Sequence, residues 1–172
     1  MLLRWFVPFR YARAIEDIDP QALRADGIRG VILDLDNTIV PWNASHPTPE
    51  VQRWIVDLVN AGVQPCIVSN NFTGRVRAVA EHLHVPVVTG AIKPTPWAFR
   101  KAMRVMGTTS QETALVGDQL FTDVLGGNLL GLRTILVDPL SAREFPTTMV
   151  VRRIERLIRR RVLKYVSPSR HA

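Results

Sequence analysis

Short apolar runs alternate along the chain with longer segments whose apolar residues recur at helical spacing. The apolar runs cover residues 31–36, 65–69, 86–88, 114–116 and 134–137. The helical patterns cover residues 48–61, 76–83, 95–106 and 122–130. Continuous apolar strands separated by helices are typical of a parallel sheet that is covered on both faces. The pattern therefore predicts an α/β fold built on a doubly wound parallel sheet.

Length and composition fit one domain of ordinary size with an extension at each end. The 172 residues are 47% hydrophobic and 22% charged, which excludes a largely disordered chain. No run of about 18 consecutive apolar residues occurs, so we expect no membrane-spanning helix. The first residues lack the features of a secretory signal, and the single cysteine, Cys66, lies in a predicted strand. We therefore expect a cytoplasmic protein.

The net charge of +7 is located at the C-terminal end. Residues 1–150 contain 14 basic and 14 acidic side chains, whereas residues 151–172 contain 8 basic side chains and only Glu155 as an acid. The apolar residues of this basic stretch share one helical face and are Val151, Ile154, Ile158, Val162 and Tyr165. Such a helix can bind a membrane surface, bind nucleic acid or pack on the body of the protein. Nucleic acid is the least favoured partner, because the tail lacks interleaved aromatic residues and a known nucleic-acid motif.

Polar side chains follow three of the predicted strands at the points where those strands end. They are Asp34 and Asp36, Ser69 and Asn70, and Asp118. Ligands of doubly wound sheets bind beyond the carboxyl ends of the strands. The sequence therefore predicts one polar crevice to which three strands contribute.

Four acidic residues, Asp34, Asp36, Asp118 and Asp123, are expected to face this crevice. Their carboxylates would repel one another strongly unless they held a hard cation. Mg²⁺ fits best, because it binds a few carboxylates together with waters and substrate phosphate oxygens. Lys93, one of three lysines, would balance the charge and serve an oxyanion. Taken alone, the Asp-x-Asp pair would more often be a turn at a strand exit, and Lys93 a solvated surface charge.

In combination, these residues resemble the four motifs of the haloacid dehalogenase (HAD) superfamily of phosphotransferases. The motifs are Asp34-x-Asp36-x-Thr38, an apolar strand ending in Ser69, Lys93 before a proline, and Gly117-Asp118-x-x-x-x-Asp123. The resemblance covers about residues 28–140. The segments around Asp34 and Asp118 are similar to the YqeG branch of the IIIA-type HAD phosphatases, which is itself similar to phosphatidylglycerophosphate phosphatases of mitochondria and cyanobacteria.

The resemblance implies a reaction in which Asp34 is the nucleophile and Asp36 is the general acid and base. Asp34, the backbone carbonyl of Asp36, and Asp118 would hold Mg²⁺. Asp123 would bind a metal-bound water or orient Lys93. The acid at position 36 also favours a phosphatase over a dehalogenase, whose ester intermediate needs no such proton donor.

The resemblance also implies contacts with the transferred phosphoryl group. Ser69 and the backbone near Asn70 would hydrogen-bond its oxygens, and Lys93 would neutralise them in the transition state. Thr38 is expected at the substrate or in a hydrogen bond within its own loop. Arg75 or Arg77, just beyond Ser69, could contact a second phosphate or the glycerol of a substrate, but a solvated helix face is the favoured interpretation for both.

The intervals between the motifs are too short for a cap domain, so we expect an open crevice that suits a phosphate on a large object. The favoured function is hydrolysis of phosphatidylglycerophosphate to phosphatidylglycerol. Two alternatives stay open: a soluble sugar-phosphate, nucleotide or nucleic-acid-end phosphatase, and a nonenzymatic phosphate-sensing module. Asp36 argues against the module, because a sensor benefits from a long-lived phosphoaspartate.

We therefore expect three parts in the chain. Residues 1–27 form an aromatic and basic segment, residues 28–140 form the phosphatase domain, and residues 141–172 contain the basic amphipathic helix. Both ends suit an anionic phospholipid surface, so peripheral attachment to the inner face of the membrane is also considered. The sequence predicts no oligomeric state.

Overall fold

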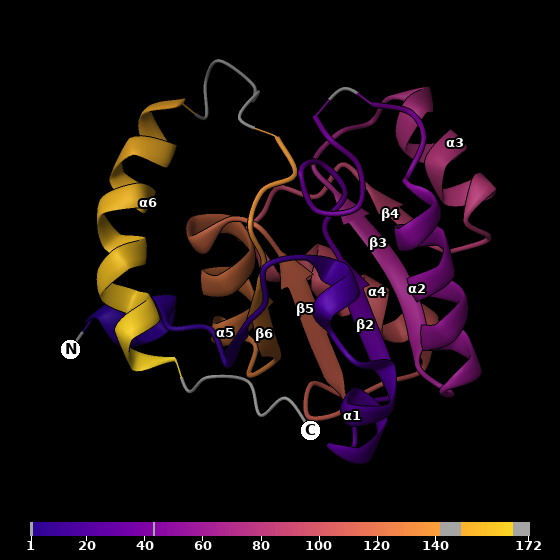
Figure 1. Cartoon of the computed structure of the whole chain (residues 1–172), viewed down its shortest axis with the longest axis horizontal. Helices are drawn as coiled ribbons and strands as arrows, with labels where there is room; N and C mark the ends of the chain where they lie inside the picture. Colours follow the sequence, from indigo (N-terminus) through magenta and orange to yellow (C-terminus); the bar gives the residue numbers. More distant parts are fainter. Residues whose placement is uncertain (1, 43, 142–148, 167–172) are drawn as a thin grey trace.

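The computed structural model describes residues 2–42, 44–141 and 149–166. Its centre is a six-stranded sheet with the strand order β1-β6-β5-β2-β3-β4, in which every pairing of neighbouring strands is parallel. The strands are β1 (Arg10–Tyr11), β2 (Gly30–Leu33), β3 (Gln64–Ser69), β4 (Val87–Thr89), β5 (Thr113–Gly117) and β6 (Arg133–Leu136). The predicted doubly wound parallel α/β fold is confirmed (Figure 1).

Helices cover both faces of this sheet (Figure 1). The α-helices are α1 (Pro20–Ala25), α2 (Pro49–Asn60), α3 (Gly74–His82), α4 (Pro96–Met106), α5 (Leu125–Leu129) and α6 (Met149–Val162). Shorter helical turns are η1 (Leu2–Phe6), η2 (Ile15–Asp17), the π-helical η3 (Leu120–Val124) and η5 (Leu163–Tyr165).

Side chains of the strands point alternately to the two faces of the sheet, and they build two separate hydrophobic clusters. Val31 and Leu33 of β2 pack in one buried cluster with residues of α1, α2 and α3. Ile32, which points to the opposite face, packs in a second cluster with Phe99 and other residues of α4. Successive side chains of a strand point to opposite faces, so both faces of β2 must be apolar. This explains the continuous apolar run from which the strand was predicted.

The ends of three central strands are in register, which is what positions the site. Leu33 pairs with Ile67 of β3 and with Val116 of β5. The residues that follow these positions therefore leave the sheet at the same edge. The predicted first strand is too long, because regular pairing stops at Leu33 and the chain turns, with Asn37 at a positive φ of 64°.

The N-terminal residues are built into the body of the protein. The two-residue strand β1, which the apolar pattern did not predict, pairs with β6 at the edge of the sheet. Ile15, Ile18 and Leu23 belong to the main core cluster. The Nε1–H of Trp54 donates a hydrogen bond of 2.7 Å to the backbone oxygen of Ile18. The division of the chain at residues 27 and 140 stays a prediction.

The described part of α6 packs against the body beside η1, beyond β6 (Figure 1). Val162 is buried in a cluster that includes residues of η1 and η3. Glu155 is 4% exposed and accepts a hydrogen bond of 2.8 Å from the backbone N–H of Phe121. Arg159 pairs with Asp138 at 2.5 Å. Packing on the body is thus confirmed for Ile158 and Val162, two residues of the predicted apolar face.

The rest of the predicted basic extension is described only in part. Residues 142–148 and 167–172 lie outside the described residues. Tyr165, expected on the apolar face, is 74% exposed. Among the described residues, none of the helices combines the length and the apolar character needed to cross a membrane.

Candidate active site

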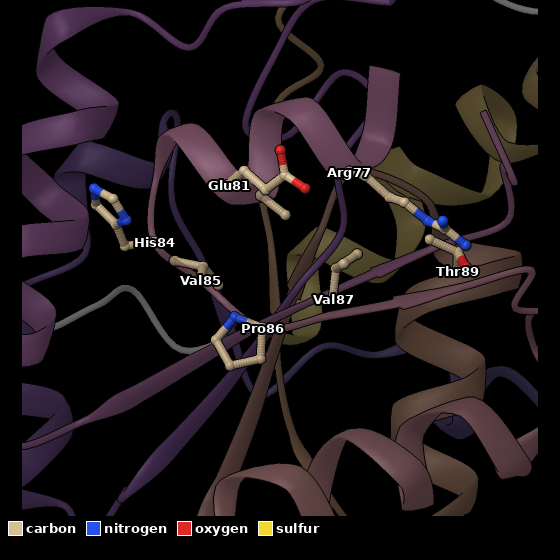
Figure 2. Close-up of a pocket in the computed structure, with 8 residues that line it drawn as sticks. Arg77, Glu81, His84, Val85, Pro86, Val87 and Thr89 are labelled. Atoms are coloured by element: carbon tan, nitrogen blue, oxygen red, sulfur yellow. The ribbon is translucent and has the colours of Figure 1, made fainter. Parts of the chain in front are cut away.

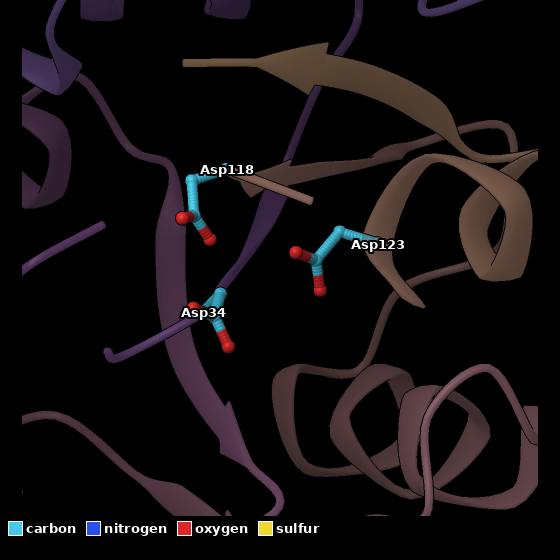
Figure 3. A group of neighbouring side chains, drawn as sticks. All are labelled: Asp34, Asp118 and Asp123. Carbon is cyan, nitrogen blue, oxygen red and sulfur yellow. The ribbon is translucent and has the colours of Figure 1, made fainter. Parts of the chain in front are cut away.

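Three acidic side chains meet at the carboxyl edge of the sheet. Asp34 follows β2, Asp118 follows β5, and Asp123 lies in η3. One oxygen of each carboxylate lies within 4.8 Å of the others, and each residue is at most 7% exposed. Figure 3 shows the three side chains converging from these separate elements. Three of the four carboxylates expected at this edge therefore form one buried cluster, whereas the predicted crevice stays a prediction.

Lys93 is the positive member of this cluster. Its side chain is 3% exposed, and its ammonium pairs with the carboxylate of Asp34 and, at 2.8 Å, with that of Asp123. The predicted interaction of Asp123 with Lys93 is therefore present. The lysine follows the loop after β4 and precedes α4, so the sheet and the helix together bring it to the carboxylates.

The electrostatics of the cluster favour an added cation. Burial raises the pKa of Asp34 to about 8, and although Lys93 opposes the rise, the charges of Asp123 and Asp118 add to it. Burial by itself would lower the pKa of Lys93, but the charges of Asp123 and Asp34 outweigh it, so the pKa of this lysine is raised. One ammonium facing three carboxylates leaves an excess of negative charge at a site shielded from water. Three convergent hard oxygen donors fit Mg²⁺, which prefers carboxylate and water ligands.

A glycine makes the cluster sterically feasible. A methyl group at Gly117 would lie 2.4 Å from Cγ of Asp123, which is closer than side-chain carbons approach. The missing side chain at the end of β5 thus leaves room for the carboxylate that Lys93 contacts. The close packing of Asp123 thus explains why a glycine precedes Asp118 in the sequence motif.

Asp36 is held apart from the buried cluster. Its carboxylate accepts a hydrogen bond of 2.7 Å from Nδ2 of Asn71 and pairs at 2.5 Å with Nη2 of Arg75. Its side chain remains 20% exposed. The carboxylate of Asp36 is not in the cluster of Asp34, Asp118 and Asp123, and its predicted contribution to the metal site, through the backbone carbonyl, stays a prediction.

The predicted phosphate-binding residues line the adjoining loops. Ser69 is 1% exposed, and its hydroxyl oxygen accepts a hydrogen bond of 3.2 Å from the backbone N–H of Asn71. Asn70 accepts, through Oδ1, a bond of 3.3 Å from the backbone N–H of Lys93. Thr38 is 1% exposed, and within the described residues its hydroxyl makes no hydrogen bond, so the expected bond within its loop is absent. Their contacts with substrate stay predictions.

Arg75 lies closer to the site residues than the sequence pattern predicts. The favoured solvated position is incorrect, because its side chain is only 16% exposed and paired with Asp36. The available signal was its place in the first turn of the helix that follows Ser69 and Asn70. A side chain in this first turn can point back toward the ends of the strands, but the spacing of residues does not reveal that Asp36 is the partner of Arg75.

A second hollow lies between α3 and the edge strand β4 (Figure 2). Its volume is about 730 Å³. It is lined by Arg77, Ala80, Glu81, His84, Val85, Pro86, Val87 and Thr89. None of the predicted site residues lines it, so it plays no part in the site described above.

Comparison with known proteins finds phosphatases by sequence. The HAD-hydrolase-like family matches residues 91–144, a stretch that includes Lys93, Asp118 and Asp123. The chain is 39% identical over 158 residues to the "Probable phosphatase YqeG" of Bacillus subtilis, and the match covers 92% of both chains. It is 26% identical over 187 residues to phosphatidylglycerophosphate phosphatase 1 of Arabidopsis thaliana. That match covers 98% of this chain but 52% of the plant protein, so the chain spans about half of that relative.

Solved structures share the fold. The cobalt-bound deoxy-D-mannose-octulosonate 8-phosphate phosphatase YrbI of Haemophilus influenzae superposes with a TM-score of 0.54 at 20% identity, over 65% of this chain and 69% of that one. The 3-deoxy-D-manno-octulosonate 8-phosphate phosphatase of Yersinia pestis superposes with a TM-score of 0.53 at 14% identity, over 77% of this chain and 74% of that one. At these identities the comparison supports the sheet architecture alone.

Proposed function

This chain belongs to the HAD superfamily of phosphatases, in its YqeG branch, and from that premise we propose that it hydrolyses phosphomonoesters through Asp34 with the help of Mg²⁺. The observation that carries the mechanism is the buried cluster of Asp34, Asp118 and Asp123 that Lys93 bridges. It unites a nucleophile, a cation site and a positive charge for phosphoryl oxygens.

The residues of the chain divide the reaction between them. The carboxylate of Asp34 attacks phosphorus, so that a bond from its oxygen to phosphorus forms while the ester bond to the leaving oxygen breaks. Asp36 gives a proton to that oxygen and later takes one from the water that hydrolyses the phosphoaspartate. Lys93 and Ser69 face the charge on the phosphoryl oxygens. Asp34, Asp118, Asp123 and the carbonyl of Asp36 would hold Mg²⁺, which when bound offsets the repulsion between carboxylate and phosphate.

We infer further that the phosphate belongs to a lipid headgroup, phosphatidylglycerophosphate. The similarity to the plant phosphatidylglycerophosphate phosphatase supports this, as does the absence of an inserted cap between the described strands and helices. The loops after β3 and β4 are joined by a hydrogen bond of 3.4 Å from the backbone N–H of Gly90 to the backbone oxygen of Asn71. These loops carry Phe72 and Ile92, which are 76% and 70% exposed. Exposed apolar side chains beside the crevice suit a lipid interface.

The outer face of the C-terminal helical region supports attachment to an anionic membrane. Leu157 is 75% exposed and Tyr165 is 74% exposed, and the exposed basic side chains of Arg160, Arg161 and Lys164 accompany them. Each basic residue near an anionic surface contributes about 1 kcal/mol. The packing of the inner face leaves this outer face accessible, so packing on the body and peripheral attachment are compatible.

The test is phosphate release from phosphatidylglycerophosphate in mixed micelles, measured with Mg²⁺ and with chelator beside a panel of soluble phosphate esters. We expect selective hydrolysis of the lipid, its loss in chelator, and its loss in Asp34→Asn. Activity of Asp34→Asn close to that of the wild type would refute the nucleophile. A clear preference for a soluble ester would keep the chemistry of Asp34 and reject the lipid substrate.

A separate measurement tests membrane attachment. Charge reversal of Arg160, Arg161 and Lys164 to glutamate should reduce sedimentation with vesicles that contain phosphatidylglycerol, while hydrolysis of a soluble aryl phosphate is retained. Reversal of the three exposed basic residues Arg100, Lys101 and Arg104 on α4 is the matched control. Equal vesicle binding by the variant and the wild type would reject this surface.

A further inference from the structure

Two side chains hold the carboxylate of Asp36, one at each oxygen. Nη2 of Arg75 contacts Oδ1 at 2.5 Å, and Nδ2 of Asn71 donates to Oδ2 at 2.7 Å. Both donors come from the segment between β3 and the first turn of α3, far along the chain from Asp36. An aspartate carboxylate can rotate about its side-chain bonds, but donors on both of its oxygens define one orientation.

Arg75 also connects this carboxylate to the loop that follows β2. Its Nη1 donates a hydrogen bond of 2.7 Å to the backbone oxygen of Ala44. One planar guanidinium therefore joins the acid of the first motif, the loop between β2 and α2, and the start of α3. Because the guanidinium is rigid and planar, a lysine at this position could not reproduce both contacts.

The position of the Asp36 carboxylate relative to the buried cluster bears on its role as a proton donor. Asp36 lies two residues beyond the proposed nucleophile, yet its carboxylate stands outside the buried cluster of Asp34, Asp118 and Asp123. A proton donor to the leaving group must sit beside the departing oxygen, on the open side of the phosphorus atom, and not among the metal ligands. The contacts of Arg75 and Asn71 hold the Asp36 carboxylate outside that cluster, where its side chain remains 20% exposed.

We propose that Arg75 and Asn71 are positioning residues that aim Asp36 at the leaving oxygen of the substrate. The inference rests on the proposed function, in which Asp36 is the general acid. It assigns to Arg75 a role in the phosphoryl-transfer step that reaches the substrate only through Asp36. A purely structural role, such as tethering the loop through Ala44, would affect all substrates alike.

The leaving group separates these two roles. A phosphate ester of a simple alcohol, such as glycerol 3-phosphate, expels a strongly basic alkoxide that needs a proton. 2,4-Dinitrophenyl phosphate expels a stable phenolate that does not. For each substrate, kcat/KM reports the steps up to phosphoryl transfer to Asp34. The later attack of water on the phosphoaspartate does not affect kcat/KM.

We expect Arg75→Ala to lower kcat/KM for glycerol 3-phosphate about 10- to 100-fold and for 2,4-dinitrophenyl phosphate less than about threefold, since general acid catalysis typically contributes about 10²- to 10⁴-fold. Asn71→Ala should show the same selectivity with a smaller loss. Arg75→Lys should be intermediate, and added guanidinium ion should restore part of the activity of Arg75→Ala toward the alkyl ester only. Arg77→Ala, an exposed arginine two residues further along α3, is the matched control and should match the wild type.

A double-mutant comparison links the effect to Asp36. In the Asp36→Asn background, Arg75→Ala should cause no further loss toward the alkyl ester, because a residue that acts only through Asp36 has nothing left to position. Additive losses would overturn the inference. Equal losses for both substrates, or no loss for either, in Arg75→Ala and Asn71→Ala would also overturn it.

The same data distinguish failure of the proposed function itself. If Asp36→Asn lowers kcat/KM equally for both esters, Asp36 is not the general acid, and both the proposal for its role and the inference built on it are rejected. If Asp36→Asn shows the selectivity and the Arg75 and Asn71 variants do not, only the inference is rejected.

Discussion

Removal of the buried ammonium of Lys93 should destabilise the folded protein strongly. Its side chain is 3% exposed and contacts two carboxylates, and the contact with Asp123 is 2.8 Å long. At that separation and an effective dielectric constant of about 20, one pair of unit charges attracts by about 6 kcal/mol. The cost of removing both charges from water offsets much of this, and breaking a buried pair by deleting one partner destabilises proteins by about 3–5 kcal/mol.

We therefore expect Lys93→Met, in chelator at pH 8, to lower the free energy of unfolding by about 3–5 kcal/mol. Urea titration followed by far-ultraviolet circular dichroism, with linear extrapolation to water, measures this quantity. At pH 5 the loss should be smaller, because the pKa of Asp34 is raised to about 8 and its neutral form no longer attracts the lysine. Mg²⁺ at pH 8 should recover part of the stability by supplying positive charge at the same place.

The control is Lys101→Met, a substitution of the same kind at an exposed position of α4, where a change within about 0.5 kcal/mol is expected. A loss below about 1 kcal/mol for Lys93→Met at pH 8, or a loss that is larger at pH 5 than at pH 8, would refute the electrostatic reasoning, because buried pairs lose about 3–5 kcal/mol.

Three other outcomes follow from the same cluster. Burial raises the pKa of Asp34 from 3.8 to about 8, so the neutral carboxyl group favours the folded state. This contribution to the free energy of unfolding is complete below about pH 4 and is lost as the pH rises through 8. Mg²⁺ should therefore raise the unfolding temperature more at pH 8 than at pH 5, and calorimetry showing the reverse order would contradict this. Asp118→Asn removes one repulsive charge from the neighbourhood of Asp34, so in chelator at pH 8 it should raise the urea midpoint while abolishing the response to Mg²⁺; a lowered midpoint would count against repulsion in the cluster. Gly117→Ala places a methyl group 2.4 Å from Cγ of Asp123, and we expect a loss of about 1–3 kcal/mol in stability and about 10²-fold in turnover; kinetics indistinguishable from the wild type would show that the close approach is unimportant.

The site was largely predictable because of one topological rule. The carboxyl ends of parallel strands meet at one edge of a sheet, so polar residues at three strand ends had to be neighbours. Asp34, Ser69 and Asp118 follow this rule, because Leu33 is in register with Ile67 of β3 and with Val116 of β5. The predicted elements were also strongly periodic, as in α2, where Thr48 caps the helix by accepting a bond from Val51 N–H.

Other features depended on contacts that no local pattern records. The strand Arg10–Tyr11 has only two residues, too few for an alternation to be recognised, and it exists because β6 offers it an edge. From its sequence pattern, the C-terminal helix could have met a membrane surface or the body of the protein, with nucleic acid as the least favoured partner. Its packing depended on the buried apolar surface around Val162 and on the hydrogen bond that Glu155 accepts from the backbone N–H of Phe121.

The sequence by itself determined the alternation of β2 to β6 with the helices between them and the identity of the side chains at the strand ends, because both follow from local periodicity and from the motifs. Only the tertiary structure decided that Lys93 lies between Asp34 and Asp123, that burial raises the pKa of Asp34, and that Arg75 holds Asp36. The physical reason is that desolvation and charge pairing depend on which atoms surround a group. In this protein those atoms come from segments that only the folded sheet brings together.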